Sequence, residues 1–266
     1  MDFSLIITDR IPDLCIMGAG EPVQCFPLYS YESSSTSKTK LQTKIRAASQ
    51  TALAGMPELA TDEEEQKETY IRKDGITDFI LKKAQTQYAD ASITKEDIFY
   101  YVYGFLHSPD YKTTFANDLK KMLPRIPLVK SREDFEAFSQ AGRELAELHI
   151  HYETAEPYIG VNITGTEKEN YKVTKMRFVT KGDKSRIRYN DAIIISGIPE
   201  RAYEYIINGK SAIEWVMERY AVTTDKDSGI KNDPNVFAEE TGNPRYILDL
   251  LLRIITVSMR TMDIVD

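Results

Sequence analysis

The chain has 266 residues, of which 42% are hydrophobic and 28% are charged, and its formal net charge is −7. This composition is ordinary for a globular protein, and no apolar run approaches the roughly 20 residues that a membrane-spanning helix needs. The amino terminus lacks a basic start followed by an apolar stretch, so we expect no signal peptide, no membrane partner and a cytoplasmic location. The two cysteines, Cys15 and Cys25, fit no metal-binding spacing.

The composition of the first third of the chain changes near residue 32, from short apolar runs to polar and acidic stretches. Short apolar runs at residues 3–7 and 14–17, broken by proline and glycine, predict an N-terminal β region over residues 1–31. Hydroxyl-rich and then acidic stretches replace these runs over residues 32–69. We expect this second segment to be a flexible polar and acidic loop.

Helical periodicity dominates residues 70–154. A side chain that caps the first turn, and a proline that ends a helix, mark the boundaries. These signals are Thr94 with Asp97, Ser108-Pro109, and Ser131 with Asp134. Between the last two signals, residues 111–122 are predicted to form one further helix.

The periodicity changes to that of strands in residues 155–266. Alternation predicts an antiparallel meander with strands over residues 171–178 and 186–195 and a turn at Gly182-Asp183. Three helices are predicted to follow, over residues 200–207, 212–220 and 245–262. Asn208-Gly209 is interpreted as a bend between the first two of these helices.

The sequence therefore predicts a mixed α+β fold in a single domain over residues 1–266. In chain order it would comprise an N-terminal β region, a flexible loop, a helical middle, an antiparallel meander and C-terminal helices.

Several patterns resemble catalytic motifs without completing one. Asn208-Gly-Lys-Ser211 has Glu204 where a phosphate-binding loop requires its first glycine. His149 and His151 are two residues apart, so on a helix they lie on different faces and cannot easily share a metal ion. No nucleophile elbow, adenine-methyltransferase motif or helicase motif is present, which disfavours a free-standing hydrolase.

Two further patterns also carry little weight. The run from Asp225 to Asp233 resembles a calcium loop, but Val236 occupies the position that requires a bidentate glutamate. Asn162-Ile-Thr164 is a glycosylation sequon, which matters only in a secreted protein.

Basic residues are distributed unevenly. Residues 168–188 hold eight lysines and arginines against Glu169 and Asp183, a local charge of +6 within an acidic chain. Such a cluster could neutralise phosphates, or it could keep an exposed sheet face in solution. On the first interpretation, which the family resemblance described below favours, the candidate DNA-contacting residues are Lys112, Lys120, Lys121, Arg125, Lys172, Lys175, Arg177, Lys181, Lys184, Arg186, Arg188 and Asn190.

The chain resembles the C-terminal specificity domain of Type ISP restriction-modification enzymes, which are large single polypeptides that read, methylate and cut DNA. The resemblance is strongest over residues 93–128, which begin Ile93-Thr-Lys-Glu-Asp-Ile98. It continues in family order through residues 24–29, 74–78, 189–190, 198–203, 209–220 and 224–235.

The resemblance implies a non-catalytic domain that recognises a double-stranded DNA sequence and partners the methyltransferase domain of the same polypeptide. It implies no cofactor in this segment, whereas ATP, magnesium and S-adenosylmethionine would serve the rest of the enzyme. It also implies that the chain is a fragment of a longer polypeptide. An alternative is a module that docks on a methyltransferase or another protein without touching bases. Salt separates the two, since DNA binding should weaken steeply as ionic strength rises.

Overall fold

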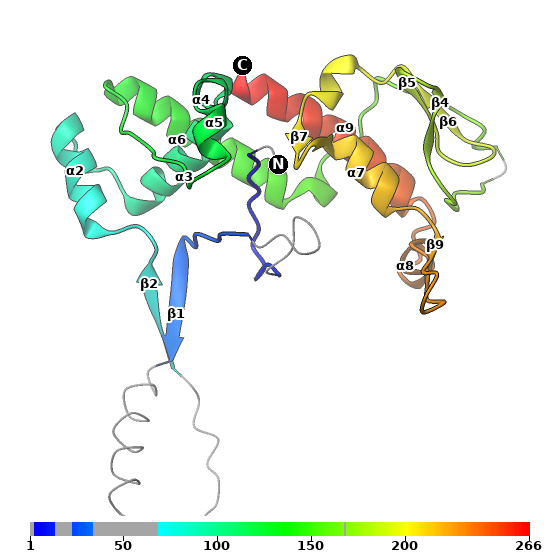
Figure 1. Ribbon diagram of the computed structural model, residues 1–266, viewed down its shortest axis with the longest axis horizontal. Helices are drawn as coiled ribbons and strands as arrows, with labels where there is room; N and C mark the ends of the chain where they lie inside the picture. Colours follow the sequence, from blue (N-terminus) through cyan, green and yellow to red (C-terminus); the bar gives the residue numbers. More distant parts are fainter. Residues whose placement is uncertain (1–2, 14–22, 34–68, 168) are drawn as a thin grey trace, which may run out of the picture. The chain divides into compact units, whose positions relative to one another are not determined.

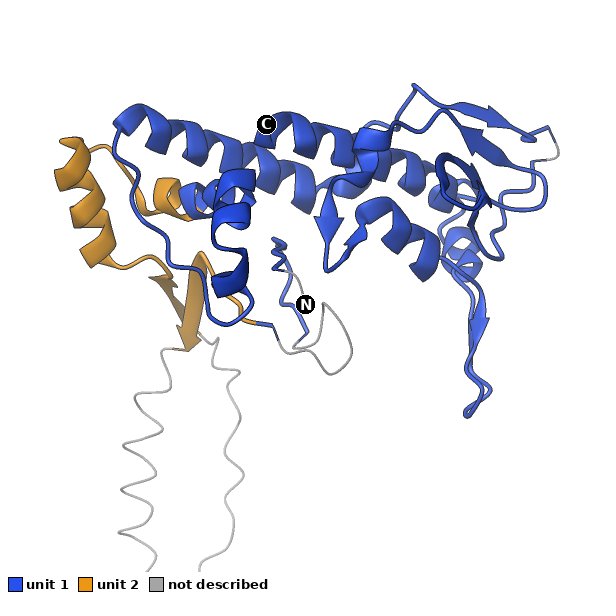
Figure 2. Ribbon diagram, turned by 45° about the horizontal axis from the view of Figure 1, so that its top comes forward, with its two compact units in different colours: residues 1–23, 100–266 blue, residues 24–99 orange. Residues whose placement is uncertain are grey.

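The computed structural model describes residues 3–13, 23–33, 69–167 and 169–266 (Figure 1). Its contacts divide the chain into two compact units (Figure 2). The large unit comprises residues 1–23 and 100–266, and the small unit comprises residues 24–99. In the described part of the chain, no helix is long and apolar enough to cross a membrane. The single domain expected over residues 1–266 stays a prediction.

The small unit contains an antiparallel pair of strands and helix α2. Its elements are β1 (Tyr29–Ser33), β2 (Tyr70–Asp74) and α2 (Asp78–Tyr88), and the two strands are antiparallel. Lys95, at the start of α3, forms ion pairs with Asp74 at 2.8 Å and Asp78 at 2.6 Å, which tie β2 to α2. β2 lies in the region predicted to be helical, because its partner strand is distant in sequence and no local signal marks the pairing.

The helices of the large unit are α3 (Lys95–His107, shared with the small unit), α4 (Pro109–Thr114), α5 (Ala116–Leu119), α6 (Arg132–Ile150), α7 (Ala212–Arg219), α8 (Asn235–Glu240) and α9 (Tyr246–Val265). The predicted caps are confirmed. The Thr94 hydroxyl accepts the Asp97 amide at 3.1 Å, and the Asp97 carboxylate accepts the Thr94 amide at 2.8 Å. The Ser131 hydroxyl likewise accepts the amide of Asp134 at 3.0 Å.

The single helix predicted over residues 111–122 is wrong, because the chain forms two short helices separated at Phe115 (φ −106°, ψ 18°). Two consecutive threonines, Thr113 and Thr114, precede the break. Both are β-branched and lose side-chain freedom in a helix, so they weaken it there.

The predicted antiparallel meander is confirmed in the large unit, but the single strand predicted over residues 186–195 is wrong. The chain turns over residues 189–193, where the Asn190 side chain accepts the amides of Ala192 and Ile193, and so forms two paired strands instead of one. The strands of the meander are β3 (Asn162–Thr164), β4 (Arg177–Thr180), β5 (Asp183–Arg188) and β6 (Ile194–Ser196), which pair in the order β3-β6-β5-β4. Two small hairpins accompany them, β7 (Ile206–Ile207) with β8 (Lys210–Ser211), and β9 (Thr223–Thr224) with β10 (Lys231–Asn232). The α+β fold class predicted from the sequence is confirmed.

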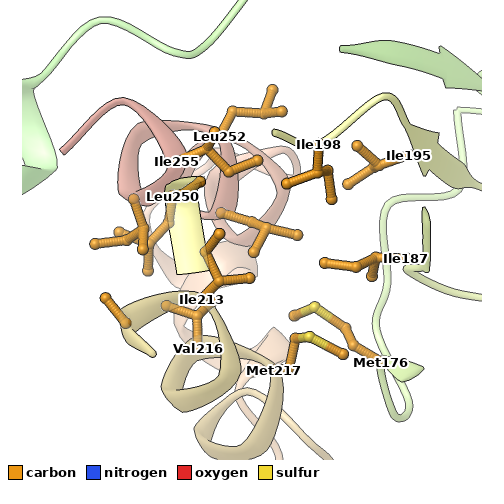
Figure 3. Packing of buried hydrophobic residues seen from close by; sticks show 14 of the residues in the cluster. Met176, Ile187, Ile195, Ile198, Ile213, Val216, Met217, Leu250, Leu252 and Ile255 are labelled. Atoms are coloured by element: carbon orange, nitrogen blue, oxygen red, sulfur yellow. The ribbon is translucent and has the colours of Figure 1, made fainter. Parts of the chain in front are cut away.

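The main core lies between one face of this sheet and helices α7 and α9 (Figure 3). Ile187 and Ile195 enter it from β5 and β6, Ile213 from α7, and Leu250 and Ile255 from α9. Each of these side chains is at most 2% exposed. Burying a side chain of this size stabilises the fold by about 1.5–3 kcal/mol, so the sheet is held mainly through its inner face.

Helices α3 and α6 approach so closely that only glycine fits at their crossing. A Cβ atom on Gly142 would lie 1.9 Å from the carbonyl oxygen of Tyr100, and one on Gly104 would lie 2.2 Å from that of Phe138. Both neighbours are backbone atoms, which cannot move aside as a flexible side chain can. The two helices therefore pack backbone against backbone at this point.

The strand predicted over residues 171–178 is wrong over its first six positions, which have no strand partner. A side chain replaces the partner strand. The amide oxygen of Asn235 accepts a hydrogen bond from the Val173 amide, and its nitrogen donates to the Val173 carbonyl, both at 2.8 Å. The Val173 backbone is thereby satisfied without a neighbouring strand.

The helix predicted over residues 200–207 is also wrong. A short 3-10 helix, η2 (Glu200–Tyr203), gives way to strand β7. Asn208 and Gly209 join β7 to β8 with φ values of 47° and 81°, so the predicted bend between helices is a two-residue β-hairpin turn. Two positive φ angles are typical of the type I′ turn, for which Asn-Gly is the preferred sequence.

The N-terminal β region is smaller than predicted. Residues 3–7 form no strand, and the Ser4 hydroxyl there accepts a hydrogen bond from the Asn208 amide at 2.7 Å. The strand predicted over residues 14–17, nearly all of the loop predicted over residues 32–69 and the basic residue Lys168 lie outside the described residues.

Candidate nucleic-acid interface

Strands β4 and β5 form a tight hairpin that carries most of the predicted basic residues. Thr180 pairs with Asp183, so Lys181 and Gly182 form the two-residue turn. Gly182 has φ +85°, a conformation that L side chains rarely adopt, which explains why glycine marks this turn. The Asp183 carboxylate then accepts the amide of Ser185 at 2.9 Å and stabilises the start of β5. The turn predicted at Gly182-Asp183 is present but lies one residue earlier, at Lys181-Gly182.

The pairing register separates the two faces of the four-stranded sheet. Ile187 lies opposite Phe178 on β4 and Ile195 on β6, and Ile195 lies opposite Ile163 on β3. These four apolar side chains form the inner face, on which Ile187 and Ile195 are fully buried. Side chains alternate along a strand, so the residues before and after Ile187 belong to the outer face.

The outer face carries three arginines. Arg188 lies opposite Arg177 on β4, and Arg186 lies two residues before Arg188 on β5. The prediction that Arg186 and Arg188 share a face is therefore confirmed. Arg177 and Arg186 are exposed, and Arg188 is half-buried. Guanidinium groups in this array can donate paired hydrogen bonds to phosphate oxygens.

None of five basic side chains at this surface forms a salt bridge with any residue that the structure describes. They are Lys175, Arg177, Lys181, Arg186 and Arg188. A cation without an ion-pair partner retains its attraction for an anionic ligand. We refer to these five residues as the cationic sheet surface.

Two other predicted lysines are already engaged with carboxylates. Lys172 contacts Glu239 at 2.5 Å, and this hydrogen bond raises the pKa of Lys172. Lys184 contacts Glu214 at 2.9 Å and lies 5.2 Å from the centre of the Tyr203 ring. A phosphate would have to displace these partners, so both lysines are less available than the cationic sheet surface.

Asn190 is buried and its amide is fully occupied by the backbone. Its nitrogen donates to the carbonyls of Asn170 at 2.9 Å and Lys172 at 3.0 Å. Its oxygen accepts the amides of Ala192 at 2.9 Å and Ile193 at 2.7 Å. We therefore assign Asn190 a structural role, holding residues 170–172 beside the turn that follows β5.

The second predicted basic group lies around α4 and α5. Lys120, Lys121 and Arg125 are exposed, whereas Lys112 is half-buried and burial lowers its pKa. Figures 1 and 2 both place α4 and α5 beside the C-terminal end of α9, whereas the four-stranded sheet lies at the other end of the large unit. The structure does not bring the two predicted basic groups together.

Sequence reasoning missed the neutral polar part of the outer face. Asn162 and Thr164 on β3 and Ser196 on β6 share this face with the arginines. The alternation of Asn162, Ile163 and Thr164 was the available signal, but three residues are too few for a periodicity to stand out.

Histidine and acidic residues offer no alternative site. In the described ranges, no cluster of three His, Cys, Asp or Glu side chains could hold a metal ion. His149 instead forms hydrogen bonds with the Tyr103 hydroxyl at 2.7 Å and the Thr261 hydroxyl at 2.9 Å. Burial lowers the pKa of His107 to about 4 and, with the nearby His107 and Lys112, that of His149 to about 3.

Comparisons with known proteins show the family to which the chain belongs. The Type ISP C-terminal specificity domain model matches residues 1–250, while no curated protein sequence matches the chain. The ATP-dependent Type ISP restriction-modification enzyme LlaBIII bound to DNA is 36% identical over 99% of this chain, with a TM-score of 0.77. A nuclease-deletion mutant of the Type ISP enzyme LlaGI, in complex with a DNA substrate mimic, is 45% identical over 73%, with a TM-score of 0.61.

A third structure, the DrdV–DNA complex, is 35% identical over 73% of this chain, with a TM-score of 0.62. These proteins are much longer, since the chain spans 15%, 14% and 20% of LlaBIII, LlaGI and DrdV respectively. The family match covers nearly all of the 266 residues. The chain therefore belongs to the family of Type ISP C-terminal specificity domains.

Proposed function

We propose that this chain recognises a specific sequence in double-stranded DNA and thereby selects where a Type ISP restriction-modification enzyme acts. Chemistry would reside elsewhere in a longer polypeptide, where a methyltransferase domain would use S-adenosylmethionine, and a nuclease and motor would use magnesium and ATP. The fragment itself would not be an enzyme, and it would act in the cytoplasm.

The observation that carries this proposal is the cationic sheet surface. Three arginines on the outer sheet face, with Lys181 in the adjoining turn and Lys175 two residues before β4, form no salt bridge in the described structure, although the whole chain has a net charge of −7. A local positive surface of this kind is the electrostatic signature of phosphate binding. LlaBIII, LlaGI and DrdV, solved with DNA or a DNA mimic, support the same ligand for this chain.

Phosphate contacts and base contacts have separable consequences. Arginines on the phosphates position the duplex, whereas side chains that reach base edges provide the sequence preference. We expect Arg177, Arg186 and Arg188 to contribute mainly to affinity and its salt dependence. Lys120, Lys121 and Arg125 near α5 would provide a separate, weaker contact.

The test replaces Arg177, Arg186 and Arg188 together by alanine. Binding to a fluorescent duplex of random sequence is measured by anisotropy as the NaCl concentration is raised. Each lost phosphate contact should reduce the slope of log affinity against log salt by about 0.9, so the triple variant should lose up to about 2.7.

The matched control removes three exposed cations elsewhere, Lys130, Lys226 and Arg260, and changes the net charge by the same amount. We expect the control to retain nearly the wild-type slope. Equal affinities and slopes for the two triple variants would contradict the proposal. Tight binding of a protein partner that is insensitive to salt, without DNA binding, would instead favour a docking module.

A further inference from the structure

The outer face of the four-stranded sheet is chemically divided. The β4–β5 side carries the three arginines, whereas the β6–β3 side carries neutral polar groups. Arg186 lies opposite Ser196, and Ser196 lies opposite Asn162. Arg188 lies opposite Ile194, which in turn lies opposite Thr164. In each of these two sets of opposed residues, β5 contributes a guanidinium group and β3 contributes an uncharged side chain.

Asn162 is the member of this neutral half whose hydrogen-bonding groups are available. It is exposed, and its side-chain amide makes no hydrogen bond with any part of the chain that the structure describes. The neighbouring hydroxyls are partly used, since Ser196 donates to the Asn162 carbonyl at 3.3 Å and Thr164 donates to the Ile194 carbonyl at 3.5 Å. Among the described strands, β3 is also at the edge of the sheet, so no described strand pairs with its free side.

The distance between β3 and β5 can be compared with the width of the major groove of DNA. Adjacent strands lie about 4.8 Å apart, so β3 lies roughly 10 Å from β5 across the face. The major groove of B-form DNA is about 12 Å wide. A four-stranded sheet is too wide to lie flat in this groove, so only its edge can enter. With the arginines of β5 on phosphates that border the groove, the edge strand β3, roughly 10 Å away, would enter it and bring its side chains to the base edges.

We propose that Asn162 reads an adenine in the major groove, with Thr164 beside it; this inference rests on the function proposed above. An asparagine side chain presents a donor and an acceptor at the spacing that matches N6 and N7 of adenine. Arginine and lysine pair better with guanine, so the neutral edge strand favours an A·T pair at its position. Asn162 would thus determine sequence preference, while the arginines provide affinity.

The test is the Asn162→Ala variant of the full 266-residue chain. Wild type and variant are each used to select duplexes from a randomised pool, and the bound fraction is sequenced. The variant should lose preference at one A·T position by a factor on the order of 5 to 150, the range for one bidentate base contact. Its affinity for random duplex and the salt dependence of that affinity should stay unchanged.

Asn243→Ala is the matched control, because Asn243 is an exposed asparagine in the loop between α8 and α9. It should retain the complete wild-type preference, and both variants should melt at the wild-type temperature. A preference unchanged by Asn162→Ala would overturn this inference alone, provided that the triple arginine variant weakens binding. Wild-type binding without any sequence preference, or no effect of the arginines, would overturn the proposed function as well.

Discussion

In the helical half of the large unit, where α3 packs on α6, His107 is buried and His149 is half-buried; in the sheet half, β4 and β5 carry their arginines on the surface. His107 is only 4% exposed and is hydrogen-bonded to the Tyr103 carbonyl at 2.9 Å. Arg177 and Arg186, in contrast, are exposed and form no salt bridge with the described residues. The first half thus encloses its two interacting histidines, and the second keeps its outer-face arginines available to a ligand. Acid should therefore act on the helical half, and salt on the sheet half.

A large effect is expected in the helical half, at the contact between α3 and α6. Gly142→Ala places a Cβ atom 1.9 Å from the Tyr100 carbonyl oxygen, so α3 and α6 must separate. Overpacking against backbone should lower the free energy of unfolding by about 3 kcal/mol, the upper part of the usual range. Urea denaturation measures this change.

Gly182→Ala is the control for that substitution. Its Cβ atom would meet nothing within 4 Å, and only the positive φ of +85° opposes it. The cost should be about 1–2 kcal/mol. A loss for Gly142→Ala no greater than that for Gly182→Ala would contradict the close helix contact.

A further effect on the helical half is expected from acid, which should lower its stability. The folded pKa values of His107 and His149 are lowered to about 4 and about 3, below the ordinary 6.5. As pH falls below 6.5 the unfolded chain binds protons that the folded chain does not, so stability falls until the folded pKa values are reached. The slope is at most roughly 1.4 kcal/mol per pH unit for each histidine.

Urea denaturation between pH 7.5 and pH 5, above the range in which most carboxylates titrate, measures this slope. The double variant His107→Gln with His149→Gln should lose most of it. A stability that is independent of pH over this range in the wild type would show that the two histidines are not held neutral.

The sheet half depends on buried asparagines rather than histidines. Asn235→Ala leaves the amide and carbonyl of Val173 without partners, since both are hydrogen-bonded to the Asn235 side chain at 2.8 Å. Unsatisfied buried groups should cost about 1–3 kcal/mol, with no dependence on pH between pH 7.5 and pH 5. Thermal unfolding measures the loss, and Asn243→Ala is the control. Wild-type stability would mean that water replaces the side chain.

The smallest expected effect on stability comes from the outer face. Arg186→Ala removes an exposed side chain without a salt bridge in the described structure, so the free energy of unfolding should change by less than about 0.5 kcal/mol. Ile187→Ala, on the inner face of the same strand, should lower the free energy of unfolding by about 2–5 kcal/mol. Denaturation of the two variants side by side compares the two faces of β5. A destabilising Arg186→Ala would show that the arginine supports the fold.

The elements that the sequence predicted correctly have local signals. Thr94 with Asp97, and Ser131 with Asp134, mark helix starts within four residues, and Gly182 marks the β4–β5 turn. The irregular course of residues 171–176 depends on Asn235, far along the chain, so periodicity could not reveal it. The Asn208-Gly209 turn was different, because its type I′ signal was present in the sequence but was interpreted as a bend between helices.

The candidate site was predictable to a similar degree. Alternation placed Arg186 and Arg188 on one face, and the register confirms it. It could not show that Lys172 and Lys184 contact Glu239 and Glu214, because both carboxylates come from distant helices. It also could not show that the Asn190 amide is occupied by the backbone, which depends on the turn after β5.

The contrast between a net charge of −7 and the local +6 over residues 168–188 has a kinetic consequence. At physiological ionic strength, charges act over about 8 Å, so a polyanion senses only the part of the surface that it meets. On the function proposed above, DNA that meets the acidic remainder would be repelled, and DNA that meets the sheet would be retained. Encounters would therefore be filtered by orientation before any base is read, and time spent in unproductive poses would be short.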